Sequence, residues 1–127
     1  MGLDIYLSGR ITIAPRHNEY RADGTEVEEI RVKLGYWRKD WFLQNYMLSR
    51  YPDEASGYEW TFGPEGLREL LGEIQSGVLN DKSITLEDGD YPQEALDRTI
   101  LILQHAIRWL EECPTTEWRD VIYRASW

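Results

Sequence analysis

Four consecutive residues, Tyr36-Trp37-Arg38-Lys39, place two aromatic rings beside two cations. Aromatic rings stack on bases and cations neutralise phosphate, so this segment is typical of a pocket that binds a nucleotide or another small anionic ligand. The segment also precedes an expected helix, whose N-terminus favours anions. A structural interpretation stands beside this one, in which Tyr36 and Trp37 fill the core while Arg38 and Lys39 reach solvent.

A second group of polar residues is expected on one face of a sheet. Asp4 and Tyr6 alternate with apolar residues in the first predicted strand, and Arg31 and Lys33 occupy the equivalent face of the next strand. This face is either a shallow binding surface or the solvated side of an antiparallel sheet. A carboxylate within an apolar strand needs a partner, and we expect Arg38 to provide it for Asp4.

An acidic stripe is the third candidate. Glu65, Glu69 and Glu73 are spaced by four residues along a predicted helix, opposite its leucines. Like charges at this spacing each cost about a few tenths of a kcal/mol, so the stripe suits a basic partner surface. The alternative is a solvated helix face that keeps the protein in solution.

Further residues of the same acidic segment extend the predicted partner surface. Asp88 and Asp90 add charge, and three aromatic residues are expected to be exposed there as anchors for a partner. These aromatic residues are Tyr58, Trp60 and Tyr91.

No metal, cofactor or catalytic residue is predicted. Residues 87–90 with Glu94 are acidic but lack the spaced oxygen ligands of a calcium loop. His17 and His105 share no ligand spacing, and Cys113 is flanked by two glutamates that disfavour a reactive thiolate. Phosphate loops, dinucleotide fingerprints and nucleophile elbows are absent from the sequence. We therefore expect a protein that is not an enzyme.

The elements that position these residues begin with a predicted hairpin. Apolar residues occupy odd positions over residues 3–13, and a second alternation places Ile30, Val32, Leu34 and Tyr36 on one face. Asp23-Gly24 lies between the two runs as a turn signal. A two-residue turn there would pair Ile13 with Leu34 and Ile11 with Tyr36.

Two helices and a short strand follow. The first helix is predicted over residues 39–50 with Asp40 as its cap, and an aromatic segment at 58–62 is predicted to be extended. Pro64 then suits the first turn of another helix, and Gly77 suits its C-terminal end.

The last helix and strand complete the fold class. Asp90 and Gln93 have the spacing of a capping box, Cys113-Pro114 ends that helix, and residues 118–127 alternate as a strand. The order predicts one α+β domain over residues 1–127. Its antiparallel sheet, made of the N-terminal hairpin and the C-terminal strand, is covered on one face by about three helices.

Three segments resemble a known family. The sequence begins Met1-Gly2-Leu3-Asp4-Ile5-Tyr6-Leu7, continues with Gly35-Tyr36-Trp37-Arg38-Lys39, and ends with Tyr123-Arg124-Ala125-Ser126-Trp127. Together they resemble small phage and prophage proteins of unassigned function, in which the start reads MGLDMYL, the junction reads YWRK and the end is an aromatic run closing in Ser-Trp. The resemblance implies phage origin and a shared fold.

Composition narrows the classes of partner. The 127 residues carry a net charge of −9, and residues 51–97 hold 12 acidic against 2 basic side chains. Proteins that bind phosphate backbones or anionic membranes carry excess Lys and Arg, so neither partner is expected. The longest apolar run is four residues and there is one cysteine, which predicts a cytoplasmic protein without a membrane span.

These observations predict a small acidic protein that acts by binding. The leading hypothesis is a phage-derived inhibitor of a host enzyme or antiviral defence complex, which attaches to a basic protein surface. The alternative is a protein that binds or sequesters a nucleotide or small ligand at residues 36–39.

Overall fold

The structure is a computed structural model that describes residues 2–13, 29–52 and 59–127. It is an α+β fold in which a four-stranded antiparallel sheet has the strand order β2-β1-β4-β3. The strands are β1 (Asp4–Ile13), β2 (Glu29–Arg38), β3 (Glu59–Phe62) and β4 (Glu117–Ser126). The helices are α1 (Trp41–Arg50), α2 (Pro64–Gln75), the short 3-10 helix η2 (Val78–Asn80), α3 (Lys82–Thr85) and α4 (Gln93–Glu111).

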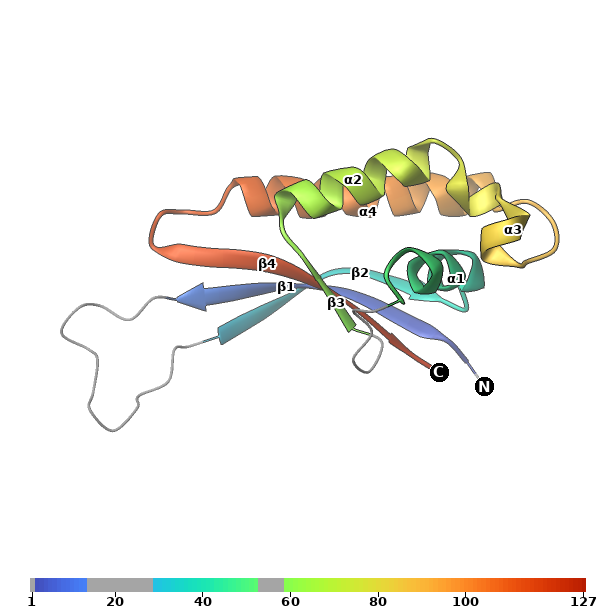
Figure 1. Cartoon of the computed structure of the whole chain (residues 1–127). Helices are drawn as coiled ribbons and strands as arrows, with labels where there is room; N and C mark the ends of the chain where they lie inside the picture. Colours follow the sequence, from blue (N-terminus) through green and yellow to red (C-terminus); the bar gives the residue numbers. More distant parts are fainter. Residues whose placement is uncertain (1, 14–28, 53–58) are drawn as a thin grey trace.

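The helices named above all lie on one side of the sheet, and no helix of the described residues lies on its other face (Figure 1). We call this other face the helix-free face. The alternation in β1 explains this arrangement, because Leu3, Ile5 and Leu7 are fully buried beneath the helices. The predicted fold class is therefore confirmed. None of the helices in the described ranges is long and apolar enough to cross a membrane.

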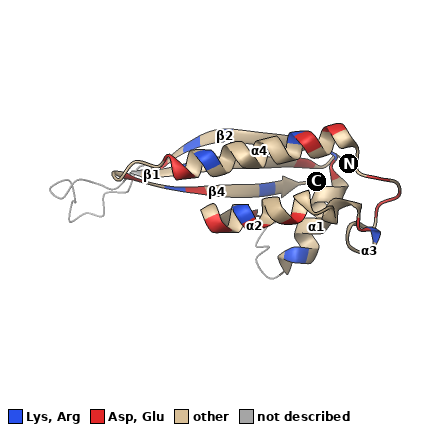
Figure 2. Ribbon diagram, turned by 90° about the horizontal axis from the view of Figure 1, so that it is seen from above, with Lys and Arg blue, Asp and Glu red and all other residues tan. Residues whose placement is uncertain are grey.

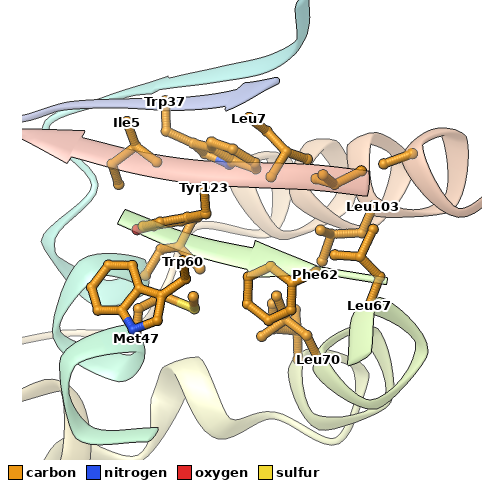
Figure 3. Packing of buried hydrophobic residues seen from close by; sticks show 14 of the residues in the cluster. Ile5, Leu7, Trp37, Met47, Trp60, Phe62, Leu67, Leu70, Leu103 and Tyr123 are labelled. Atoms are coloured by element: carbon orange, nitrogen blue, oxygen red, sulfur yellow. The ribbon is translucent and has the colours of Figure 1, made fainter. Parts of the chain in front are cut away.

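The core lies between the sheet and the helices (Figure 3). Large rings from different elements meet there: Trp60 of β3 contacts Tyr123 of β4 with ring centroids 5.4 Å apart. Leu67 and Leu70 of α2 and Leu103 of α4 close the core from the helical side, and all three are buried. Burial of this apolar area is the main stabilising contribution to the fold.

The predicted hairpin is present, but its predicted register is wrong. Ile11 pairs with Ile30 rather than with Tyr36, and Ile5 pairs with Trp37. The register also shifts between Leu7 and Ser8, which leaves Leu34 as the extra residue of a β-bulge. Beyond the bulge the side chains of β2 change face, so Trp37 is buried in place of Tyr36. The predicted turn at Asp23-Gly24 lies outside the described residues.

The helix predictions are confirmed at most termini. Asp40 caps α1 by accepting a hydrogen bond from the Leu43 amide at 3.0 Å, and Pro64 is the first residue of α2. The capping box at Asp90 is wrong: α4 begins at Gln93 after Pro92 and has no side-chain cap. Two short helices, η2 and α3, were not predicted. They have three and four residues, which are too few for a helical periodicity to be recognised in the sequence.

Candidate functional site

Three segments meet at one end of the sheet: the start of β1, the end of β2 beyond the bulge, and the end of β4. Asp4 of β1 lies between Arg38 of β2 and Ser126 of β4. Two residues further along, Tyr6 lies between Tyr36 and Arg124. Because alternate side chains of a strand share a face, these six residues lie together on the helix-free face.

Asp4 has a partner on this face, but it is not the predicted one. The Tyr36 hydroxyl donates a hydrogen bond to the Asp4 carboxylate, and this bond raises the pKa of Tyr36 because it stabilises the neutral phenol. The rings of Tyr36 and Tyr6 contact each other with centroids 5.2 Å apart. The expected partner, Arg38, is exposed beside this group and opposite Asp4 in the register.

The predicted pocket at residues 36–39 does not form, because the four side chains are divided between two faces. Trp37 is 1% exposed and its indole nitrogen donates to the Thr99 hydroxyl at 2.8 Å, so its ring is unavailable for stacking. Tyr36 lies on the opposite face, while Arg38 and Lys39 are exposed. The pleat of the strand imposes this division, since successive residues point to opposite faces.

A hollow of about 410 Å³ opens on the helix-free face next to Tyr6. Three strands line it with the residues Tyr6, Ser8, Arg31, Ile122, Arg124 and Ser126. The prediction that Asp4, Tyr6, Arg31 and Lys33 share one face is confirmed by the register. Four lining residues were not singled out from the sequence, namely Ser8, Ile122, Arg124 and Ser126. For the three residues of β4 the signal was the alternation of that strand, which becomes informative only once the strand is placed beside β1. Ser8 belongs to β1 itself and alternates with its apolar residues, as Asp4 and Tyr6 do.

The predicted acidic stripe on α2 is only partly free. Glu65 and Glu69 are exposed, but Glu73 accepts hydrogen bonds from the Tyr46 hydroxyl and from Arg50 Nε at 3.2 Å. Partial burial raises the pKa of Glu73. The arginine on this helix, Arg68, contacts Glu111 of α4 at 2.5 Å and so links α2 to α4.

Asp88 and Asp90 are exposed in the segment between α3 and α4, as the acidic-surface prediction requires. The Asp90 carboxylate lies 3.8 Å from Lys82 Nζ. In the described ranges no group of three or more His, Cys, Asp or Glu side chains is placed to hold a metal ion.

Two of the predicted aromatic anchors are buried, which corrects the expectation that they are exposed. Trp60 is 1% exposed and its indole nitrogen donates to the Tyr51 carbonyl oxygen at 2.9 Å. Tyr91 is 5% exposed and packs against Phe42. Both rings lie in an acidic stretch of sequence, yet burial of a large ring stabilises the fold more than exposure would. Tyr58 lies outside the described residues.

Tyr91 belongs to a buried hydrogen-bond network behind α1. Its hydroxyl donates to the Asp40 carboxylate and lies 3.0 Å from the Thr99 hydroxyl, which also accepts from Trp37. Burial raises the pKa of the Asp40 carboxyl, and burial together with the Asp40 charge raises the pKa of Tyr91. The adjacent Gln44 is fully buried and accepts from the Tyr123 hydroxyl at 2.7 Å.

Charge is segregated between the two sides of the molecule. Residues 64–112 form the layer of α2, η2, α3 and α4, and they carry eleven Asp or Glu against four Lys or Arg. We call this segment the acidic helical layer. The four strands carry five Asp or Glu against six Lys or Arg, including those seen on β2 and β4 in Figure 2. The net charge of −9 therefore comes mainly from the helical side.

Comparisons with known proteins returned nothing similar to this chain, whether among protein-family models, curated proteins or solved structures. The resemblance of the three segments to small phage proteins stays a prediction.

Proposed function

We propose that this chain is a non-catalytic binding protein that docks on a basic protein surface through its acidic helical layer. The observation that carries the proposal is the segregation of charge: eleven acidic against four basic side chains in residues 64–112, and near balance on the strands. Such a distribution steers a cationic partner to one side of the molecule and orients it before contact.

The resemblance to phage proteins suggests the class of partner. A phage protein acts inside a bacterial host, so the partner we propose is a host protein with a basic surface, such as an enzyme that handles nucleic acid or an antiviral defence complex. Occupying a basic surface that otherwise binds a phosphate backbone would inhibit such a partner.

The residues proposed to make the contact are the exposed carboxylates of the acidic helical layer. On α2 these are Glu65 and Glu69, and on the segment after α3 they are Asp88 and Asp90. Glu73 is left out because its carboxylate is held by Tyr46 and Arg50. Reversing Glu73 would disturb the packing of α1 on α2 and would confuse a binding result with a folding result.

The test is affinity capture from bacterial lysate with the tagged chain at two salt concentrations, followed by mass spectrometry of the retained proteins. We expect a basic protein that is retained at low salt, weakened at higher salt, and lost when Glu65→Lys and Glu69→Lys are combined. Retention of the same protein by the reversed variant would contradict the proposal.

A matched control separates position from net charge. Glu29→Lys with Glu59→Lys changes the net charge equally, and both residues are exposed on the strands, outside the acidic helical layer. We expect this control to weaken retention less than the α2 variant does. An equal loss from both variants would show that net charge alone, and no particular surface, retains the partner.

A further inference from the structure

The hollow on the helix-free face has the composition of an anion site. Of its six lining residues, Arg31 and Arg124 are cationic, Ser8 and Ser126 carry hydroxyls, and none is acidic. The guanidinium group presents its N–H donors in a planar fork that matches the oxygens of phosphate. Its volume of about 410 Å³ falls within the range of small-molecule sites, which is roughly 300 to 1,000 Å³.

The two arginines of the hollow form fewer ion pairs and hydrogen bonds than their neighbour Arg10. Arg10 is held by Asp120, to which it donates from two nitrogens. Arg124 is exposed and forms no ion pair with any residue in the part of the chain that the structure describes. Arg31 has a 3.4 Å contact with Glu29 and its side chain is 50% exposed. Two guanidinium groups therefore have donors to offer a ligand.

The hollow also offers a flat aromatic surface at its rim. Ile122 of β4 lines the hollow but is only 1% exposed, so the surface that a base can contact comes from Tyr6. At its rim Tyr6 is 41% exposed, and its ring is supported by contact with Tyr36, which is itself fixed by the hydrogen bond to Asp4. A supported ring with one accessible side is a platform on which a planar ligand can stack.

The charges around the hollow limit the number of phosphate groups that a bound ligand can carry. Carboxylates of Asp4, Glu29, Glu59 and Asp120 lie on the same face, where the register places Glu59 opposite Arg124. They repel a polyphosphate, and the net charge of −9 repels a nucleic-acid strand. The two guanidinium groups can neutralise the charge of one phosphate group, and the carboxylates nearby oppose the binding of any further phosphate.

We propose that the hollow binds a nucleoside monophosphate, with the phosphate between Arg31 and Arg124 and the planar base on the ring of Tyr6. This site is independent of the acidic helical layer, because it lies on the other face of the sheet. It can therefore be supported or rejected whatever the outcome for the protein partner.

The experiment is calorimetric titration of the full chain with adenosine, guanosine, cytidine and uridine 5′-monophosphates. Adenosine and inorganic phosphate serve as partial ligands in separate arms, and a single-stranded oligonucleotide is a further arm. We expect at least one monophosphate to saturate a single site, with both partial ligands binding about tenfold more weakly or worse. No saturation by any of the four monophosphates at millimolar concentration would overturn the proposal. Equal binding of inorganic phosphate would overturn the role of the base, and tighter binding of a single-stranded oligonucleotide would overturn the small-molecule assignment.

Three variants locate the ligand. Arg124→Gln removes one guanidinium from the hollow, and we expect about a tenfold loss of affinity, in line with a lost charged hydrogen bond. Arg108→Gln makes the same change on the exposed surface of α4 and should bind as the wild type does. Tyr6→Ala should weaken the monophosphate but leave inorganic phosphate unchanged. Wild-type affinity in Arg124→Gln, or an equal loss in Arg108→Gln, would place the ligand elsewhere and overturn the proposal. Circular dichroism of each variant checks that the fold is kept.

Discussion

Asp40 supports two parts of the structure with one carboxylate. One oxygen accepts from the Leu43 amide and caps α1, and the other accepts from the Tyr91 hydroxyl, which joins α1 to the start of α4. The side chain is nearly buried, so both hydrogen bonds compensate for the loss of water around a charged group.

Removal of the Tyr91 hydroxyl tests this role. In Tyr91→Phe the Asp40 carboxylate stays buried with one partner fewer, and we expect a loss of about 1 to 3 kcal/mol in the free energy of unfolding. Urea denaturation measures the loss. Tyr6→Phe is the control, because Tyr6 is 41% exposed and its hydroxyl can be solvated. Equal stability of Tyr91→Phe and the wild type would contradict the network.

The pH dependence of stability gives a second prediction for Asp40. Its pKa is raised by burial above the ordinary value of 3.8, so the folded state retains this proton to higher pH than the unfolded state does. Protonation of Asp40 therefore stabilises the folded state. This stabilisation is complete below the ordinary pKa and is lost as the pH rises through the folded-state pKa.

Comparison with Asp40→Asn isolates this contribution, because asparagine also caps helices and does not titrate. We expect the stability of the wild type relative to Asp40→Asn to fall as the pH rises from about 4 towards neutrality. Urea denaturation of both proteins across this range measures the difference. A difference that is constant, or that grows with pH, would contradict the raised pKa of Asp40.

At this scale the sequence predicted Asp40 correctly as a cap, because a cap depends on residues within one turn. It did not predict the burial of Trp60 and Tyr91, since whether a ring is covered depends on elements far away in the chain. Tyr91 is covered by α1 and Trp60 lies against β4, and neither contact has a local signal.

At the scale of elements, two glycines let α4 approach the sheet closely. A β-carbon added to Gly9 would lie 2.5 Å from Trp109 Cη2 and 2.8 Å from Val32 Cγ2. One added to Gly35 would lie 2.5 Å from Ile102 Cγ2. The helix therefore rests against the backbone of β1 and β2 through Trp109 and Ile102.

Gly9→Ala tests this contact. We expect a loss of about 1 to 3 kcal/mol, because the indole of Trp109 or the strand must move to admit the methyl group. Gly72→Ala is the matched control within α2, where a β-carbon meets nothing within 4 Å. It should be neutral or stabilise by up to about 1 kcal/mol, as expected for glycine in a helix interior. Thermal unfolding of both variants decides the matter, and a Gly9→Ala variant as stable as the wild type would contradict the close contact.

The sequence predicted the existence of the four strands and three longer helices. The three long strands, α2 and α4 carry a clear periodicity over several residues, whereas α1 was recognised by its cap and wide apolar face and β3 by its aromatic residues. It could not predict the register of β1 on β2. An alternation of period two is satisfied equally by any slip of two residues, and the bulge at Leu34 then moves Tyr36 to the other face. The composition of the candidate site depends on strand pairing, so Arg124 and Ser126, which the sequence offered only as part of a terminal motif, were placed in the site by the structure.

At the scale of the whole molecule, the chain separates two kinds of surface. The acidic helical layer covers one face of the sheet, and two tyrosines and two arginines of the paired strand segments lie on the other face, namely Tyr6, Tyr36, Arg38 and Arg124. The proposed partner surface and the proposed anion site therefore lie on opposite faces of the sheet, and each proposal is tested by variants that leave the other surface unchanged.

The central claim is that the acidic helical layer docks a basic partner, and the association rate with the captured protein tests it most directly. For the wild type we expect the rate constant to fall by about tenfold or more as the salt concentration rises from about 50 to 300 mM. For the Glu65→Lys and Glu69→Lys double variant we expect a slower rate at low salt and a flatter salt dependence. Identical rates and slopes for the two proteins would contradict the claim.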